Sequence, residues 1–148
     1  MIFSKSFGYA LRGVLYVSAM SENGKRIRIE EIAKKLGVPK HFLGKVMNKV
    51  VKENILYSAK GFYGGFFVNE STLSTPLIKL FEIAGDGQTF TTCALSLKKC
   101  NRQNPCPLHD TIVKTRDSFY EILKTTTIKD LLIKKNPDLV RSLAIMPD

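Results

Sequence analysis

The stretch IEEIAKKLGVPKHFLGKVMNKVV, residues 29–51, carries two apolar patterns at helical spacing, and a short turn from Gly37 to Pro39 separates them. The first pattern stops at Gly37. Pro39 suits the first position of the second helix, because the N–H that proline lacks is not needed there. The apolar stripe of the second helix consists of Phe42, Leu43, Val46, Met47, Val50 and Val51. The stretch therefore predicts two helices joined by a brief turn, a helix-turn-helix.

The opposite face of the second predicted helix is polar and basic. Such a helix can pack by one side and present the other to the major groove of DNA, although an ordinary surface helix has the same pattern. Glycine in mid-helix costs about 1 kcal/mol relative to alanine, and close approach to DNA or to another helix would explain Gly44. The candidate DNA-contacting residues of this helix are Lys40, His41, Gly44, Lys45, Asn48, Lys49 and Lys52.

The next segment, ILYSAKGFYGGFFVNE, predicts a β-hairpin. Two strand-like runs, residues 55–59 and 66–69, flank a turn that contains three glycines. A hairpin directly after a helix-turn-helix is a wing. A basic side chain at its tip can enter a minor groove or contact a phosphate, so Lys60 and Tyr63 join the candidate DNA-binding residues.

Composition and charge agree with a nucleic-acid partner. The chain has 148 residues and is 44% hydrophobic, which is enough for one domain with its own core. Its net charge is +10, and residues 25–60 hold ten basic and three acidic residues. Concentrated positive charge suits a polyanion, although a solvated surface has the same charge. No apolar run reaches the ~18 residues of a membrane span and no secretion signal is present, so we expect a cytoplasmic protein without a membrane partner.

Further elements are expected on both sides of this region. Ser4 can cap a first helix, and residues from 71 onward predict a helix that ends near Gly85 or Gly87. Pro107 can open a helix that runs to about residue 124, and Thr127 resembles the capped start of a short last helix through residue 133. The tail after that helix is expected to be weakly structured. The predicted fold is mainly α with a small β-hairpin.

All three cysteines of the chain lie in the stretch CALSLKKCNRQNPCPLH, residues 93–109, with the spacing C-x6-C-x5-C-x2-H. Thiolates and imidazole are ligands of iron–sulfur clusters and of zinc. The basic neighbours Lys98, Lys99 and Arg102 would lower the pKa values of the thiols. Structural zinc sites usually contain a C-x2–4-C pair, which is absent here, but the wide spacing does not exclude zinc. Chance placement of three cysteines in one loop is the plain alternative.

The chain resembles the Rrf-two (BadM-type) family of winged-helix transcriptional regulators, especially its IscR-like and NsrR-like members. The resemblance rests on SKSFGYALRGVLYV, IEEIAKKLGVPKHFLGKVMNKV and KGFYGG in this order, and it continues through the cysteine loop and the following helix. It implies a homodimer that binds a partly palindromic double-stranded DNA operator. The expected parts are a winged helix-turn-helix DNA-binding domain (1–85), a cysteine-containing sensor loop (86–107), and a long dimerisation helix with a C-terminal tail (108–148).

The resemblance also implies a cofactor. Iron–sulfur members of the family carry three cysteines in this loop, and in the IscR-like members a histidine three residues after the third cysteine completes a 2Fe–2S site. The implied ligands are Cys93, Cys100, Cys106 and His109. A 2Fe–2S cluster is favoured and 4Fe–4S is possible, and the cluster can be lost during purification. The gap between Cys93 and Cys100 is one residue longer than in IscR-like members. Gly8 stands where NsrR-like members have an acidic ligand.

Three functions remain open at this point. The favoured one is a transcriptional regulator whose cluster senses redox state, nitric oxide or cluster supply. The second is a regulator of the same family that works without a cluster, as a thiol switch or with zinc. A redox enzyme or electron carrier is least favoured, because the sequence has no nucleophile–base set, no glycine-rich nucleotide loop and no C-x-x-C motif. We therefore expect a protein that is not an enzyme.

Overall fold

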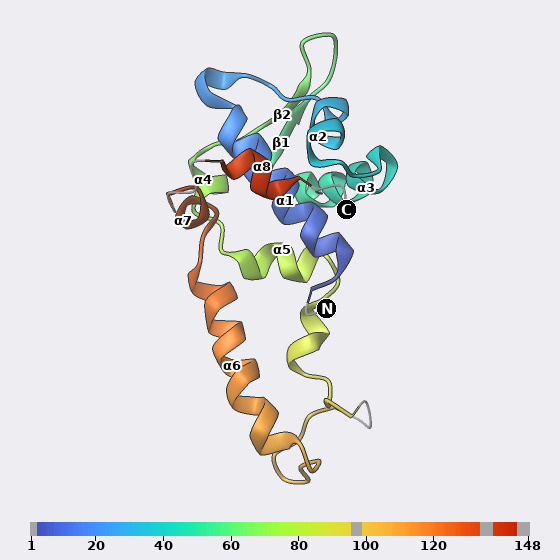
Figure 1. Ribbon diagram of the computed structural model, residues 1–148, viewed down its shortest axis with the longest axis vertical. Helices are drawn as coiled ribbons and strands as arrows, with labels where there is room; N and C mark the ends of the chain where they lie inside the picture. The colour runs from blue at the N-terminus through green and yellow to red at the C-terminus, as the bar shows by residue number, and fades with distance from the viewer. Residues whose placement is uncertain (1–2, 96–98, 134–137, 145–148) are drawn as a thin grey trace.

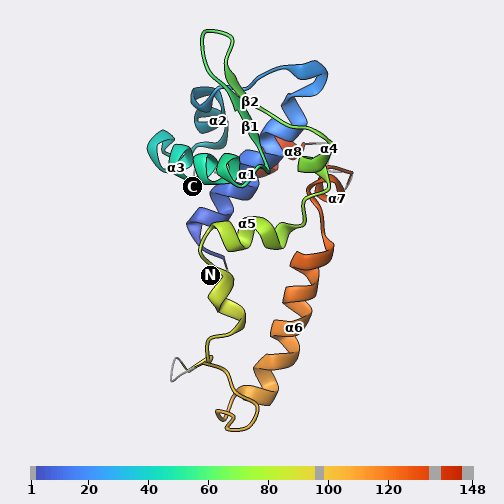
Figure 2. The same cartoon turned by 180° about the vertical axis from the view of Figure 1, so that it is seen from behind.

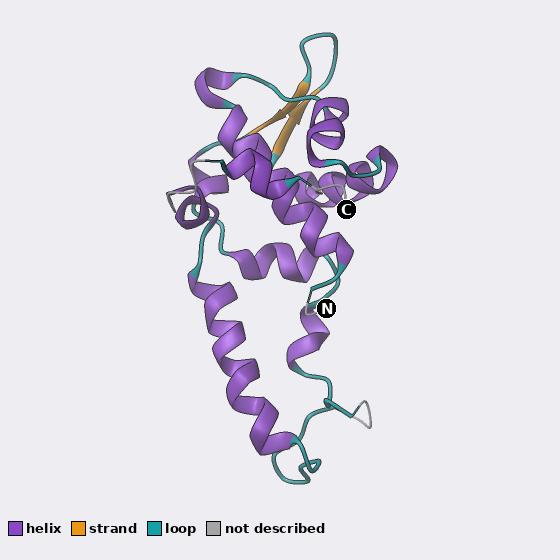
Figure 3. Ribbon diagram, in the orientation of Figure 1, coloured by secondary structure: helices purple, strands orange, loops and turns teal. Residues whose placement is uncertain are grey.

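The computed structural model describes residues 3–95, 99–133 and 138–144 of the chain. It is mainly helical, with one two-stranded hairpin (Figure 1, Figure 3). The elements are α1 (Lys5–Met20), α2 (Ile29–Leu36), α3 (Lys40–Lys52), β1 (Tyr57–Ala59), β2 (Gly65–Phe67), α4 (Glu70–Leu73), α5 (Leu77–Ile83), α6 (His109–Thr125), α7 (Ile128–Ile133) and α8 (Leu139–Leu143), with short 3₁₀ turns at Glu22–Gly24 and Gly87–Phe90.

Helix α1 is the centre of the core. It begins where the sequence predicts, because the Ser4 hydroxyl accepts a hydrogen bond from the Phe7 N–H at 3.1 Å. It packs closely on α3 at Gly13, where a Cβ atom would lie only 2.6 Å from the Met47 sulfur. The side chains that α1 buries are Phe7, Ala10, Val14, Leu15, Tyr16 and Val17.

The predicted helix-turn-helix is present as α2 and α3. Helix α2 ends at Gly37, whose φ of 64° is the left-handed conformation that glycine adopts readily. Pro39 lies one residue before α3 rather than in its first position. The predicted buried stripe is too broad, because Leu43, Val46, Met47 and Val50 are buried but Phe42, at the margin of the stripe, is 55% exposed.

A third segment, at Ile27, pairs with the hairpin, and the sequence did not predict this pairing. β1 and β2 pair antiparallel, with Ser58 opposite Phe66, and both strands are shorter than predicted. Ile27, which precedes α2, also pairs with Phe66 through two backbone hydrogen bonds of 2.8 and 2.7 Å. Gly65 has a φ of 141°, and a Cβ there would lie 2.8 Å from the Ile27 backbone. Glycine at this position therefore allows the Ile27 backbone to approach β2.

The single helix predicted from residue 71 to Gly85 or Gly87 is wrong, because two helices occupy this segment. α4 ends at Leu73, and α5 begins after Pro76, which lacks the N–H that a continuous helix would use. The backbone around Pro76 pairs with Thr127, and the Leu77 N–H donates to the Thr126 carbonyl at 2.9 Å. α5 is thereby joined to the end of α6.

Helix α6 projects from the rest of the molecule, and the cysteine loop lies at its far end, away from α3 and the hairpin (Figure 1, Figure 2). The helix begins at His109, two residues after Pro107. Of its 17 residues only His109 and Leu123 are buried. Helix α6 is therefore mostly unpacked within one chain.

The C-terminal segment returns to the core. The predicted cap of α7 is confirmed, because the Thr127 N–H donates to the Asp130 carboxylate at 2.8 Å and the Asp130 N–H donates to the Thr127 hydroxyl at 3.2 Å. The expectation of a weakly structured tail is wrong for residues 139–143, which form α8 against α1 with Leu143 buried.

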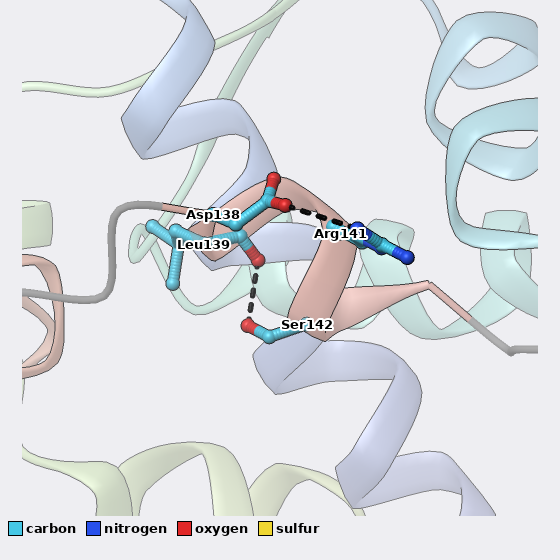
Figure 4. Close-up of polar contacts among 4 residues, drawn as sticks. All are labelled: Asp138, Leu139, Arg141 and Ser142. Carbon is cyan, nitrogen blue, oxygen red and sulfur yellow. Dashed lines mark hydrogen bonds and ion pairs between the residues drawn. The ribbon is translucent and has the colours of Figure 1, made fainter.

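Arg12 fixes α8 to the helix-turn-helix. Its guanidinium donates through Nε to the Leu143 carbonyl and through Nη2 to the Leu36 carbonyl at 2.6 Å. It thus satisfies the last carbonyls of α8 and α2 together. Within α8, Arg141 lies 3.7 Å from Asp138, and the Ser142 hydroxyl donates to the Leu139 carbonyl at 2.7 Å (Figure 4).

Candidate DNA-binding surface and cysteine loop

The polar face of α3 is open to solvent, as a DNA-reading helix requires. Gly44 is half-buried, and a Cβ there would meet no other atom within 4 Å. Close approach to another helix of the described chain therefore does not explain this glycine, whereas approach by an external partner would. The exposed candidate residues of α3 are Lys40, His41, Lys45, Asn48, Lys49 and Lys52.

A concave surface runs from α3 to the hairpin. Gly44 and Asn48 line it on the α3 side, Ser58 and Lys60 line it on the hairpin side, and Arg28 lies between them. Lys60 and Arg28 are exposed. The structure therefore brings the two predicted groups of DNA-binding residues, on the helix and on the wing, to one basic surface.

Lys40 is engaged in an ion pair in this structure. Its ammonium lies 2.7 Å from the Glu30 carboxylate, and both side chains are more than half exposed. The hydrogen bond from Lys40 lowers the pKa of Glu30. Exposed pairs of this kind contribute little to stability, so Lys40 could exchange Glu30 for a phosphate group at small cost.

Arg28 lines this surface and Arg26 lies beside it, next to the hairpin tip, and neither was among the residues predicted from the sequence. Ile27 is fully buried between them, and both arginines are exposed. Arg26 donates to the Tyr63 carbonyl at 3.4 Å, and its guanidinium carbon lies 5.6 Å from the centre of the Phe67 ring. The alternation Arg-Ile-Arg was the signal that could have revealed this pairing segment.

The tip of the hairpin carries two aromatic residues in the open. Phe62 is 81% exposed and Tyr63 is 82% exposed. Their rings are nearly perpendicular, with centres 5.0 Å apart. The turn is tight, because the Gly64 N–H donates to the Gly61 carbonyl at 2.9 Å.

The cysteine loop is partly ordered by backbone pairing. Thr92 pairs with Lys99, and the Cys100 N–H donates to the Thr91 carbonyl at 2.8 Å. Lys98, one of the basic neighbours named from the sequence, lies outside the described residues. Lys99 and Arg102 line a small cavity with Cys100 and His109. The structure therefore places two of the three basic neighbours beside Cys100.

The structure brings two of the four predicted ligands into contact. The Cys100 sulfur lies 3.2 Å from His109 Nδ1, and the His109 N–H donates to the Cys106 carbonyl at 2.9 Å. Cys93 is buried and Cys106 is half-buried. Over the described ranges, no group of three or more Cys, His, Asp or Glu side chains lies close enough to hold one metal ion.

The loop is attached to α6 and, through aromatic residues, to the start of α1. Arg116 of α6 donates to the Phe90 carbonyl at 3.2 Å and to the Thr92 carbonyl at 2.9 Å. The Phe90 ring also contacts the rings of Phe81 and Phe119 in tilted arrangements, with centres 5.2 and 5.7 Å apart. The same cluster continues to Phe3 and Phe7 at the start of α1.

A hydrogen bond also connects the start of α1 to the segment before the cysteine loop. The Ser4 hydroxyl, which caps α1, donates to the Asp86 carboxylate at 2.5 Å, and Asp86 directly precedes the 3₁₀ turn that leads into the cysteine loop. The beginning of α1 is therefore in contact with the segment that carries Cys93.

No helix in the described part of the chain is long and apolar enough to cross a membrane.

Comparisons with known proteins agree with this architecture. Residues 3–134 match the Rrf2 family model, described as iron-dependent transcriptional regulator. A predicted HTH-type transcriptional regulator of Aquifex aeolicus (strain VF5) is 34% identical over 134 residues, which cover 89% of this chain and 92% of that protein.

Two solved structures have the same fold at low sequence identity. CymR (YrzC), described as the global cysteine regulator of B. subtilis, superposes with a TM-score of 0.69 at 17% identity, covering 87% of this chain and 94% of that one. T. potens IscR superposes with a TM-score of 0.65 at 16% identity, covering 87% of this chain and 84% of that one. The predicted winged-helix fold with a small hairpin is thus confirmed.

Proposed function

The chain belongs to the Rrf2 family of transcriptional regulators, and from that premise we propose that it binds a two-fold symmetric operator as a homodimer. Helix α3 of each protomer would lie in a major groove, and the hairpin would reach the neighbouring minor groove. The observation that carries this proposal is the continuous basic surface formed by α3, Arg28 and Lys60.

The dimer is proposed from the exposed apolar side chains of α6. Leu108, directly before the helix, is 41% exposed, Tyr120 is 37% exposed and Ile122 is 57% exposed. A helix that keeps only two residues buried in its own chain leaves this apolar surface in water. A second α6 would cover it, and the two-fold symmetry of such a pair would match a palindromic operator.

We further propose that the cysteine loop binds an iron–sulfur cluster through Cys93, Cys100, Cys106 and His109, with 2Fe–2S favoured over 4Fe–4S. Three thiols and an imidazole are suitable donors for such a cluster, and Cys100 and His109 are already adjacent. When bound, the cluster would supply a group whose charge changes on oxidation, nitrosylation or loss. In the conformation described, the donors are not all gathered, so binding would require Cys93 and Cys106 to approach the Cys100–His109 pair.

The route from the loop to DNA would run through α1. Arg116 and the aromatic cluster connect the loop to α6 and α1, and the Ser4–Asp86 hydrogen bond joins the loop segment to the cap of α1. Helix α1 then packs on α3 at Gly13. A ligand shifts such a system only if it binds the two conformations unequally, so a cluster that needs a closed loop would favour one position of α1 and α3.

A second candidate is a regulator of the same family without a cluster, working as a thiol switch or with zinc. The 3.2 Å contact between the Cys100 sulfur and His109 Nδ1 favours it, because this pair is already in contact without a cluster. This candidate does not need Cys93 to move.

DNA binding is tested by fluorescence anisotropy with duplexes selected by the wild type from a random 30-bp pool. The wild type should bind less tightly as salt rises, because phosphate contacts release counterions. Lys45→Ala should lower the affinity and reduce the salt slope by about one. Lys129→Ala, an exposed lysine on α7, is the matched control and should bind as the wild type does. Equal loss in both variants would remove α3 from the interface.

The cluster is tested by visible absorption and by iron and sulfide analysis of protein purified without oxygen. A red-brown wild type with about two irons per chain, bleached in Cys106→Ala, supports the cluster and makes His109→Ala the next variant. A colourless, iron-free wild type would overturn the cluster proposal. Zinc analysis then separates the zinc form from the thiol switch.

A further inference from the structure

The exposed aromatic pair at the hairpin tip is unusual for a basic surface. Phe62 and Tyr63 are each more than four-fifths exposed, although large apolar side chains normally lie inside. Neither ring packs on the core of the described chain. Two adjacent exposed aromatics indicate a partner that covers them.

The charge around the tip identifies the kind of partner. The hairpin and its flanks contain no acidic residue between Glu53 and Glu70. Lys60, Arg26 and Arg28 surround the tip and are exposed. Phe62 and Tyr63 also line a shallow depression with Arg26 and Arg28. An apolar tip within a ring of cations complements a surface of bases bordered by phosphates.

The tip is held in a defined position before any partner binds. Arg26 donates to the Tyr63 carbonyl, and the Gly61–Gly64 hydrogen bond closes the turn. Gly61 has a φ of 98°, and a Cβ at Gly64 would lie 2.8 Å from the Gly61 carbonyl oxygen. Only glycine fits these two positions without strain, so the turn has a defined backbone from which the two rings project.

We propose that Phe62 is a wedge that enters the minor groove of duplex DNA, partly separates one base-pair step and bends the duplex. The inference rests on the proposed function. Apolar side chains inserted from the minor groove unstack a step and kink DNA toward the major groove. Because the two rings stand perpendicular at 5.0 Å, only one can enter the stack. Phe62 has no polar atom to desolvate, whereas the Tyr63 hydroxyl can donate to base or sugar oxygens at the floor of the groove.

The proposal makes a claim about operator sequence. Pyrimidine–purine steps such as TA and CA unstack most readily. Duplexes selected by the wild type should carry such a step where the hairpin lies, and duplexes selected by Phe62→Ala should lose that enrichment.

The direct test uses a selected duplex with 2-aminopurine at that step and a fluorophore at each end. Wild-type binding should raise the 2-aminopurine fluorescence, because the base unstacks, and should shorten the end-to-end distance. Phe62→Ala should lose both signals and bind about 10- to 100-fold more weakly, the range that stacking contacts usually cover. Phe62→Leu should retain both, because leucine also serves as a wedge.

Lys60→Ala is the matched control at the same tip. It should weaken binding and reduce the salt slope but keep the fluorescence and distance signals, because it removes charge and leaves the ring. Circular dichroism of each variant should match the wild type, since these side chains are exposed. If the wild type binds the duplex but neither signal appears, and Phe62→Ala binds equally well, the wedge is overturned and the aromatic pair belongs to a protein contact. If the wild type binds no duplex, the proposed function itself fails.

Discussion

The α1–α3 region and the α6 region are stabilised in different ways. In the first, α1, α2, α3 and the hairpin enclose a core in which Leu36, Leu43 and Met47 are fully buried. In the second, α6 buries two of its 17 residues, and Arg116 and the Phe90 ring connect the helix to the segment that leads into the cysteine loop. One region is complete in a single chain. The other leaves apolar side chains such as Tyr120 and Ile122 exposed.

We propose that the two regions have separate tasks. A close-packed body keeps the α3 surface in a fixed shape, as recognition of a duplex requires. An incompletely packed α6 and loop can take up a second chain and a ligand, because few internal contacts must be given up when they rearrange. Predictions about stability therefore concern the first region, and predictions about association and signalling concern the second.

The largest expected effect is on the core of the first region. Leu43→Ala should lower the free energy of unfolding by about 2–5 kcal/mol, because a fully buried leucine leaves a cavity between α3 and α1. Thermal or urea denaturation measures it. A change below about 1 kcal/mol would mean that α3 is not packed as the structure has it.

The second prediction concerns α6. Ile122→Ala should weaken self-association about 10- to 100-fold, because a two-fold interface loses the side chain twice. Sedimentation equilibrium measures the dissociation constant. Since Ile122 is 57% exposed, the unfolding of the isolated chain should change by no more than about 0.5 kcal/mol. If Ile122→Ala instead destabilises the chain and leaves self-association unchanged, Ile122 packs within its own chain and α6 is not the dimer interface.

The third prediction tests whether α8 is part of the first region. Arg12→Gln should destabilise the fold by about 1–3 kcal/mol, because the carbonyls of Leu36 and Leu143 lose their donor. Burial of the guanidinium also lowers the pKa of Arg12. Arg141→Gln is the control: its ion pair with Asp138 is exposed, and about 0.5 kcal/mol or less is expected. Urea denaturation measures both variants. If both lower the free energy of unfolding by the same amount, Arg12 does not hold α8.

The smallest effect concerns pH. Burial, with the hydrogen bond to Glu31, raises the pKa of Tyr16 to about 12. In the unfolded chain the pKa of a tyrosine is near 10. Between about pH 10 and 12 the folded state therefore keeps the Tyr16 hydroxyl proton that the unfolded state has lost, so stability should fall as the pH rises through this range. Tyr16→Phe should lose about 0.5–1.5 kcal/mol at neutral pH and show a flatter decline above pH 10 in urea titrations. The same decline in both proteins would remove Tyr16 as its cause.

Local sequence signals predicted most of the DNA-binding region. Caps, glycine stops and apolar spacing located α1, α2 and α3, because each depends on residues near one another in the chain. The pairing of Ile27 with the hairpin was missed, since Arg26 and Arg28 acquire their place only when Ile27 pairs with Phe66 across 39 positions. The short helix α8 was missed for a similar reason: five residues form a helix only when packing against α1 supports them.

The cysteine loop shows a different limit. The spacing of Cys106 and His109 indicated a shared site, and the structure places Cys100 against His109. Whether Cys93 joins them depends on the conformation of the loop when a ligand binds, which neither periodicity nor residue type determines. The cluster therefore remains a proposal, whereas the winged helix is confirmed.

We propose that the cysteine loop controls the DNA affinity of the distant α3 surface. The most direct measurement is the dissociation constant for a selected duplex, determined by anisotropy for oxygen-free protein and again after oxidation in air, with Cys106→Ser measured in parallel. We expect the wild-type affinity to change by about 5- to 150-fold, the usual range of coupling between two sites, and the Cys106→Ser affinity to stay within about two-fold. Equal affinity of both wild-type forms, while the visible absorption or thiol content changes, would contradict the claim.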